Sequence, residues 1–505
     1  MKKCRFTAMR IFSMILAAVT LTAPILTACA DSDTENGSED STALSISEAS
    51  ETEEETEPDI LCGLSYGGRT FNIRASDTSI SSNYLIEGSG ELTGDNVNDA
   101  VYDRNLAVED QLDVKFAYEH TDNGYADVAP SVETLVLSGD STFDLLIDDQ
   151  LGFSTASIEM LFHDAAPLTT VDFDEDCWWG DYMKNLSIDY KHIYLLVGDY
   201  FMDVLNHSHA LIYNRDMYTD TFGDPDDVYK LVADGKWTYE NMLTLIEGAY
   251  QDVNGNGKAD PKDIYGMIVG GIGGSSFPFT YGGDVKLITR DENGYPTLTM
   301  YGDRLIDLYE KIRSVFWSSG TSTKYNENGA NLHAKFEEGG ALIVSGCQLG
   351  DISVFRDMEA EIGVIPYPKQ DEAQEKYVTV VHDTAEVGAI PLTAKDPEIT
   401  GAVCQALCRQ THETVLPAYY EMTLKVKYAR DNYTSEMIDL IHDGITDMFA
   451  LVYSAKYANN ITTWAILEPL NTNGDSITSA YESREAAALQ GLSDLVVTFE
   501  ENLAK

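Results

Sequence analysis

The stretch Val97–His120 reads VNDAVYDRNLAVEDQLDVKFAYEH, and it decides the fold class. Its apolar residues fall at mostly helical spacing as far as Leu112, and Val114–Tyr118 then alternates like a strand. A second helix-like stretch leads to Phe143–Ile147 (FDLLI), a short apolar run typical of a buried parallel strand. Strands that alternate with helices in this way predict βαβ units and an α/β fold.

The N-terminus has the pattern of an export signal that ends in a lipidated cysteine. It opens with MKKCRFTAMR, which contains four basic residues and no acid, and an apolar stretch follows from Ile11 to Leu26. The segment ends in LTAC (26–29), which resembles a bacterial lipobox. We therefore expect a signal peptide over residues 1–28 and acylation, for example by palmitate, of Cys29. The protein would then be anchored to the outer face of the cell membrane without spanning it. An ordinary signal peptide with a chance cysteine is the alternative.

Residues 29–60 are predicted to form a disordered acidic tether behind this anchor. Positions 31–59 hold twelve acids and no base, and Ser and Thr fill much of the remainder. Such a segment has too little apolar surface to fold, and its charges repel one another. We expect it to hold a folded body away from the membrane.

Charge and length restrict what that body can be. The sequence holds 84 acidic and 33 basic residues, a net charge of −51. This charge argues against nucleic-acid binding and favours solubility outside the cell. No later apolar run is long enough to predict a second membrane segment. The chain beyond the tether is too long for a single hydrophobic core, so we expect two lobes.

The cysteines do not indicate a disulfide framework. Apart from Cys4 and Cys29, an odd number of cysteines remains, namely Cys62, Cys177, Cys347, Cys404 and Cys408. Their spacing is not that of a zinc site. Cys404 and Cys408 lie four apart in an apolar helical pattern, which favours packing over bridging.

The stretch 252–263 (DVNGNGKADPKD) has the spacing of a twelve-residue calcium loop. Gly257 stands at the sixth position, where such loops need glycine. The expected ligands are the side chains or carbonyls of Asp252, Asn254, Asn256, Lys258, Asp260 and Asp263. A helix is predicted before the loop and a short apolar run after it, so we expect a structural Ca²⁺ rather than a switch. A polar turn without metal is the alternative.

Several further segments, in their order along the chain, resemble the lipid-anchored extracellular solute-binding proteins of ABC importers. This family-1 group includes maltose-binding protein, and the likeness is to its clostridial members. It covers roughly residues 70–503 and is carried by stretches such as DAVYDRNLAVED (99–110), CWWGDYMKNLSI (177–188), HALIYNRDMY (209–218), KWTYENMLTL (236–245), FEEGGALIVSG (336–346), VHDTAEVGAIPLTAKDPEITG (381–401) and LKVKYARD (424–431).

The resemblance implies a two-lobed periplasmic-binding-protein-like fold of the class II type, with strands that cross between the lobes. HALIYNRD looks like the first crossing and VVHDTA (380–385) like the return. Lobe I would comprise residues 61–204 and about 382–440, and lobe II residues 205–381 and about 441–505. Such a monomer closes on a small solute, most often a sugar, and delivers it to the permease subunits of the importer.

Seven residues are candidates for contact with the solute: Asp148, Trp178, His207, Phe277, Gln348, Asp383 and Trp464. His207 and Asp383 lie on the expected crossings, and Asp148 ends a strand where α/β folds bind ligands. Gln348 follows the apolar run ALIVS. The aromatic candidates offer ring faces to a sugar, although Trp178 fits equally well as an anchor for its loop.

Two other functions fit parts of the sequence. The calcium loop resembles that of dockerins, which suggests a surface adhesion or scaffold lipoprotein, but dockerins carry two loops in tandem. A secreted carbohydrate-active enzyme would need a carboxylate pair. Asp148 and Asp149 are neighbours on one strand, so their side chains point to opposite faces. No GxSxG, HExxH or phosphate-loop motif is present.

Overall fold

The computed structural model describes residues 59–78, 81–322, 332–425, 433–457 and 460–505. Within the described chain, Leu64–Lys505 forms one compact unit. The expected signal peptide, Cys29 and nearly all of the tether lie outside the described residues. In the described part of the chain, no helix combines the length and the apolar character that a membrane span requires.

The first of two main sheets contains the strands predicted near the N-terminal end of the folded body. Its order is β11-β3-β1-β2, from β11 (Glu386–Ala389), β3 (Leu145–Asp149), β1 (Arg69–Ser76) and β2 (Val114–Thr121). β1 pairs in parallel with β2 and β3, whereas β11 runs antiparallel to β3. The strands predicted at Val114–Tyr118 and Phe143–Ile147 are therefore confirmed as β2 and β3.

Helix α2 (Asn96–Leu112) shows how the sequence sets these elements. The side chain of Asp95 caps it by accepting the N–H groups of Val97 and Asn98, which have no partner inside the helix. Val97, Val101, Val108 and Leu112 are buried along one face, whereas Leu106 is exposed. Asp113 then adopts a left-handed conformation (φ 52°) and ends the helix directly before β2.

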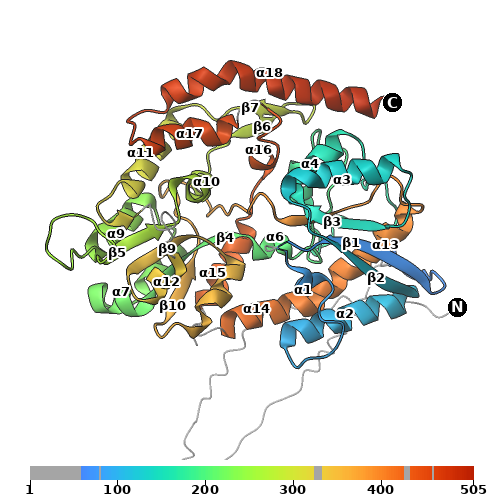
Figure 1. Ribbon diagram of the computed structural model, residues 1–505, viewed down its shortest axis with the longest axis horizontal. Coiled ribbons are helices and arrows are strands. Elements are labelled where there is room, and N and C mark those ends of the chain that lie inside the picture. The colour runs from blue at the N-terminus through green and yellow to red at the C-terminus, as the bar shows by residue number, and fades with distance from the viewer. Residues whose placement is uncertain (1–58, 79–80, 323–331, 426–432, 458–459) are drawn as a thin grey trace, which may run out of the picture. The chain divides into compact units, whose positions relative to one another are not determined.

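The second sheet has the order β10-β4-β9-β5-β8. It consists of β10 (Ile362–Ile365), β4 (His209–Asn214), β9 (Ala341–Gln348), β5 (Tyr265–Val269) and β8 (Thr321–Ser322). β5 runs parallel to β8 and β9, and β4 is antiparallel to both β9 and β10. Figure 1 shows the two sheets on opposite sides of the short helix α6 (Asp203–Asn206).

Two passages of the chain connect the sheets, and they run side by side. The outgoing segment, residues 203–209, comprises α6 and the start of β4. The return segment, residues 380–386, leads from the second sheet into β11. Ser208 and Val381 form an antiparallel bridge, the N–H of His209 donates to the carbonyl of Val380, and the N–H of His382 donates to that of His207. We call these paired segments the crossing.

Helices and short elements complete the described fold. They are α1 (Asn83–Ile86), α3 (Tyr125–Leu137), α4 (Gln150–Ile158), α5 (Gly180–Leu186), α7 (Arg215–Phe222), α8 (Asp227–Ala233), α9 (Tyr239–Ala249), α10 (Ile272–Gly282), β6 (Ile288–Arg290), β7 (Pro296–Leu298), α11 (Asp303–Phe316), α12 (Leu332–Glu337), η2 (Leu349–Asp357), α13 (Pro397–Gln410), η3 (Thr411–Val415), α14 (Leu416–Lys425), α15 (Tyr433–Asp443), α16 (Phe449–Val452), α17 (Ile461–Asn471) and α18 (Thr478–Leu503).

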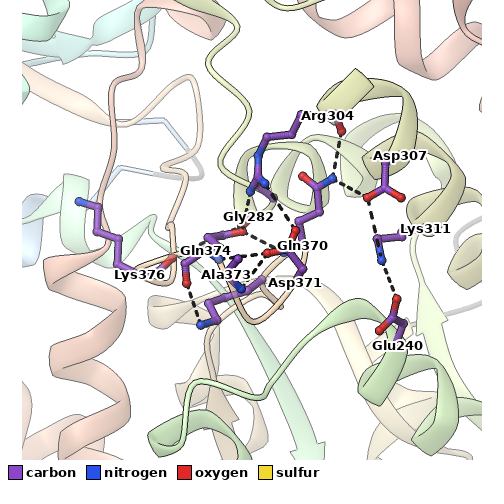
Figure 2. Close-up of polar contacts among 12 residues, drawn as sticks. Glu240, Gly282, Arg304, Asp307, Lys311, Gln370, Asp371, Ala373, Gln374 and Lys376 are labelled. Atoms are coloured by element: carbon purple, nitrogen blue, oxygen red, sulfur yellow. Dashed lines mark hydrogen bonds and ion pairs between the residues drawn. The ribbon is translucent and has the colours of Figure 1, made fainter. Parts of the chain in front are cut away.

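The loop between β10 and the return segment is held by a network of amides (Figure 2). The side-chain amide of Gln374 donates to the carbonyls of Gly282 and Lys376, each at 2.8 Å. Gln370 donates from its side chain to the carbonyl of Arg304 and the carboxylate of Asp307. These contacts attach the loop to α10 and α11, so the return segment starts from a fixed position.

The long C-terminal helix α18 contacts elements from distant parts of the chain. It packs against α17 and β7, and also against α4. Near its end, the side-chain amide of Asn502 donates to the carbonyl of Ile158, the last residue of α4, over 2.9 Å. The buried ring of Phe499 packs on Tyr194 beside it.

Candidate functional site

The crossing carries a cluster of three histidines and two acids. We define the crossing cluster as Asp203, His207, His209, His382 and Asp383. The ring of His382 lies 6.2 Å from that of His207 and 6.0 Å from that of His209, with which it is stacked. A carboxylate oxygen of Asp203 lies 3.0 Å from Nδ1 of His207, and one of Asp383 lies 3.2 Å from Nδ1 of His382.

The three histidines have different electrostatic environments. Burial alone would lower the pKa of His207, but its contacts with Asp203 outweigh this effect and raise the pKa above the ordinary value. Burial lowers the pKa of His209 to about 3, and neighbouring His382 lowers it further. Burial also lowers the pKa of His382. At neutral pH His209 and His382 are therefore uncharged, and His207 is the ring that Asp203 favours as a cation.

A cavity of about 200 Å³ lies next to the crossing at the ends of β1 and β3. We call it the carboxylate pocket. Asp149 and Glu386 face each other across β3 and β11 and both line it. The remaining lining residues are Ser76, Thr78, Asn123, Gly124, Tyr125 and Thr384. The pocket thus occupies the carboxyl edge of the parallel strands, where α/β folds bind ligands.

The acids in and beside this pocket are hard to ionise. Burial raises the pKa of Asp148 to about 6, and the N–H of Asp149 and the Arg74 guanidinium oppose that rise only in part. Burial raises the pKa of Asp149 to about 7, although its carboxylate accepts the N–H of Gly152 as the N-cap of α4. Burial also raises the pKa of Glu386 well above its ordinary value. Such shifts are typical of functional sites.

Buried polar atoms without a hydrogen-bond partner occur at several described residues, and at this site two side chains lack partners of normal geometry at every polar atom. One is His209, at both ring nitrogens, and the other is Glu386, at both carboxylate oxygens. Both are only 3% exposed. Native proteins rarely leave buried polar groups in this condition, so each points to a partner that binds from outside the chain.

The structure brings most of the residues proposed from sequence to these two places. His207 and Asp383 belong to the crossing cluster, and Asp148 adjoins the carboxylate pocket. The ring of Phe277 meets that of His209 edge-on at 5.0 Å. Gln348 pairs with His209 between β9 and β4.

The two tryptophans lie elsewhere. Trp178 is buried, donates from its indole to Gln405 over 2.8 Å and packs edge-on against Phe173. This is the environment of a loop anchor, and we leave Trp178 out of the site. Trp464 lies on α17 and is 43% exposed. Other residues of that helix, Thr462 and Ile466, line a small cavity together with Phe277.

Sequence reasoning missed Glu386, Asp203 and Thr384. Glu386 carried a usable signal, because it is a charged residue at the start of an apolar run that became the buried strand β11. Asp203 carried none, since its position beside the return segment depends on the pairing of segments far apart in the sequence.

The predicted calcium loop connects α9 to β5 and folds around its own oxygens. The carboxylate of Asp252 accepts the N–H groups of Asn256 and Gly257, and Gly257 has the positive φ (70°) that this position needs. Asp263 is fully buried and accepts the N–H of Asp260. Within the described residues, no three His, Cys, Asp or Glu side chains form a metal site by themselves. Ca²⁺ would therefore need the Asn and main-chain oxygens as well, and the loop supplies both.

Comparison with known proteins identifies structures with a similar fold. No protein-family model matches the chain, and no curated protein does. Among solved structures, a cyclic α-maltosyl-1,6-maltose binding protein from Arthrobacter globiformis matches with a TM-score of 0.58 at 12% identity. The match covers 85% of this chain and 100% of that one. The chain has the fold of an ABC transporter solute-binding protein.

Two more solved structures agree with this assignment. A sugar transporter from Rhizobium etli in an open conformation matches with a TM-score of 0.55 at 14% identity, over 84% of this chain and 99% of that one. An ABC transporter solute-binding protein from Thermotoga lettingae, bound to α-D-tagatose, matches with a TM-score of 0.51 at 12% identity, over 85% and 100% of the two chains. The expected two-lobed α/β fold is therefore confirmed. The residue limits of the lobes and the clostridial likeness stay predictions.

Proposed function

We propose that the protein binds a small carbohydrate between its two lobes and delivers it to an ABC importer. The observation that carries this proposal is the carboxylate pocket at the carboxyl edge of the first sheet, directly beside the crossing. A solute held there contacts one lobe, and closure about the crossing adds contacts from the other lobe. Only such double contact makes the closed state more favourable when the solute is bound.

The similar structures support a sugar as the solute. Three of them hold α-D-tagatose, maltotetraose and cycloalternan as bound ligands. The polar lining of the carboxylate pocket, with hydroxyl, amide and carboxylate groups, suits a molecule made of hydroxyls. Tyr125, exposed at the start of α3, offers a ring face at the edge of the pocket.

The protein acts in this proposal by binding and not by catalysis. An enzyme of this kind would use the acids of the pocket as proton donors, and a covalent or hydrolytic step would consume the solute. Acylated Cys29 would keep the protein at the outer face of the membrane, next to the permease. The calcium loop would stabilise the second lobe.

A ligand screen followed by scattering tests this function. The purified mature chain is screened by thermal shift against mono- and oligosaccharides, and a ligand at a hundred times its Kd should add about 2.7 kcal/mol to the free energy of unfolding. Small-angle scattering should then give a smaller radius of gyration with that ligand than with a sugar that does not bind. Turnover of the ligand, or tight binding without compaction, would contradict the proposal.

A further inference from the structure

The carboxylate pocket contains two buried acids without a matching positive group, so their ionisation is unfavourable until a cation binds. Its described lining includes two carboxylates, Asp149 and Glu386, and no Lys, Arg or His. The two residues face each other on neighbouring antiparallel strands, an arrangement in which like charges destabilise a sheet. A site with this composition lacks the cation that would ordinarily accompany two buried acids.

Most other acids nearby have a partner within the chain. Asp148 accepts the N–H of Asp149 and is close enough to Arg74 for attraction. Asp203 contacts His207 and Asp383 contacts His382. The guanidinium of Arg74 donates from Nη1 to Ser131 and is attracted by Asp148, while its buried Nη2 has no hydrogen-bond partner among the described residues. Arg74 does not line the pocket, and neither it nor a histidine of the crossing cluster pairs with Glu386.

Glu386 itself is the least satisfied of these acids. Its main-chain N–H is bonded to Asp203, but neither carboxylate oxygen has a hydrogen bond of normal geometry among the described residues. The hydroxyls of Ser76 and Ser81 are near enough to favour ionisation slightly, yet they bond to each other at 3.0 Å. A buried carboxylate without a strong donor costs free energy, so its presence calls for a donor from the ligand.

We propose that the solute carries a protonated amine, and that this ammonium group binds between the carboxylates of Asp149 and Glu386. An ammonium supplies three N–H donors and one positive charge, which are the two things the pocket lacks. The net charge of −51 would also draw such a cation toward the protein. The inference rests on the proposed function and adds the charge of the solute to it. An amino sugar meets both requirements.

Matched ligands test the charge requirement by calorimetry on the mature chain. Glucosamine and its β-linked dimer are compared with glucose and the neutral N-acetylated dimer, and 1,4-diaminobutane serves as an amine without a sugar ring. We expect each amino sugar to bind at least tenfold more tightly than its neutral counterpart. Added salt should reduce this difference in affinity less than it would weaken an exposed ion pair, because the pocket is buried.

Variants test the two carboxylates. Glu386→Gln keeps the shape and removes the charge, so it should lower affinity for the amine at least tenfold. It should also raise the melting temperature of the ligand-free protein, since an unpaired buried acid is removed. Asp149→Asn preserves the helix cap and should likewise weaken amine binding, which gives a second test if the first variant does not fold. Glu133→Gln, an exposed acid on α3, is the matched control and should change neither property.

The outcomes separate this inference from the proposed function. Neutral sugars that bind as tightly as their amines would overturn the ammonium site and leave the sugar-binding function standing. Tighter binding of 1,4-diaminobutane than of any sugar would keep the ammonium site and overturn the carbohydrate. If neither amines nor neutral oligosaccharides bind, both proposals fail.

Discussion

The main-chain N–H of Glu386 donates to one carboxylate oxygen of Asp203 over 2.7 Å, and the other oxygen of that carboxylate lies 3.0 Å from the ring of His207. One buried side chain thus joins the outgoing segment of the crossing to the return segment. The same contact fixes the position of the backbone at the carboxylate pocket. The crossing cluster and the pocket are therefore mechanically connected through Asp203.

Replacing Asp203 by Asn should destabilise the protein in a pH-dependent manner. The pKa of His207 is raised in the folded state, so this pair contributes fully below the ordinary pKa of 6.5 and its contribution is lost as pH rises through the folded pKa. We expect a loss of about 1–3 kcal/mol at pH 6 and a smaller loss at pH 9, measured by urea unfolding. Asp189→Asn breaks a similar Asp–His contact away from the crossing and should leave solute affinity unchanged. If Asp203→Asn lowered the free energy of unfolding equally at pH 6 and pH 9, that result would contradict this account.

Replacing Asp149 by Asn should have the opposite effect on stability as pH rises. Because the folded pKa of Asp149 is about 7 against an ordinary value of 3.8, wild type loses stability between these values, where the group ionises in the unfolded chain but keeps its proton in the folded one. Asn still caps α4, so the variant should exceed wild type by about 1–3 kcal/mol at pH 8 and show little advantage at pH 4. Asp140, whose pKa is lowered by Thr142, is the control. Asp140→Asn should lose stability toward higher pH, and a gain there would refute the argument.

Removal of calcium should lower stability without changing solute affinity. If the free Ca²⁺ concentration is a hundred times the Kd of the loop at 252–263, binding of the ion adds about 2.7 kcal/mol to the free energy of unfolding. Chelation should lower the melting temperature of wild type, and Asp252→Ala should abolish that response. Asp291→Ala removes a similar turn-forming carboxylate and should keep the response. A tenfold change of solute affinity with calcium, about 1.4 kcal/mol of coupling, would instead make the ion regulatory.

Replacing Cys29 by Ala should prevent anchoring of the protein. The acyl chains that this cysteine is expected to carry hold the protein at the membrane, so the variant should appear in the medium or remain as an unacylated precursor. Cell fractionation and labelling with a fatty-acid analogue distinguish these products from wild type. Cys4→Ala, in the expected signal peptide, should leave the mature protein labelled. Unchanged labelling of the Cys29→Ala variant would exclude the lipobox.

Local patterns in the sequence were sufficient for several elements and for the α/β class, whereas the two-lobed fold was predicted from the resemblance. The spacing of Val97, Val101, Leu106, Val108 and Leu112 predicts α2 because it is a property of a single helix, although Leu106 lies on the exposed face. The alternation after Asp113 predicts β2 in the same way. The turn chemistry of residues 252–263 similarly predicts a loop between a helix and a strand. These features depend on neighbours along the chain.

The site could be predicted only in part, because it is built from pairings over long distances in the sequence. His207 and Asp383 could be proposed because resemblance placed them on crossing strands. The contact of Asp203 with Glu386 joins residues separated by 183 positions, and no local pattern encodes it. Trp178 illustrates the reverse case, since its aromatic ring suits a sugar equally well until the indole is seen bonded to Gln405.

Helix α18 has a consequence for how the two lobes can move if they have the predicted limits, which place α4 in lobe I and α18 in lobe II. The helix packs against α17 and β7, and its last turn is hydrogen-bonded through Asn502 to the end of α4. The lobes are thus linked here as well as at the crossing. Two bodies joined at two points retain one rotational degree of freedom, about the line through those points. We therefore expect lobe closure to rotate about the line through the crossing and the C-terminal turn, and movement in another direction to break the contact between Asn502 and Ile158.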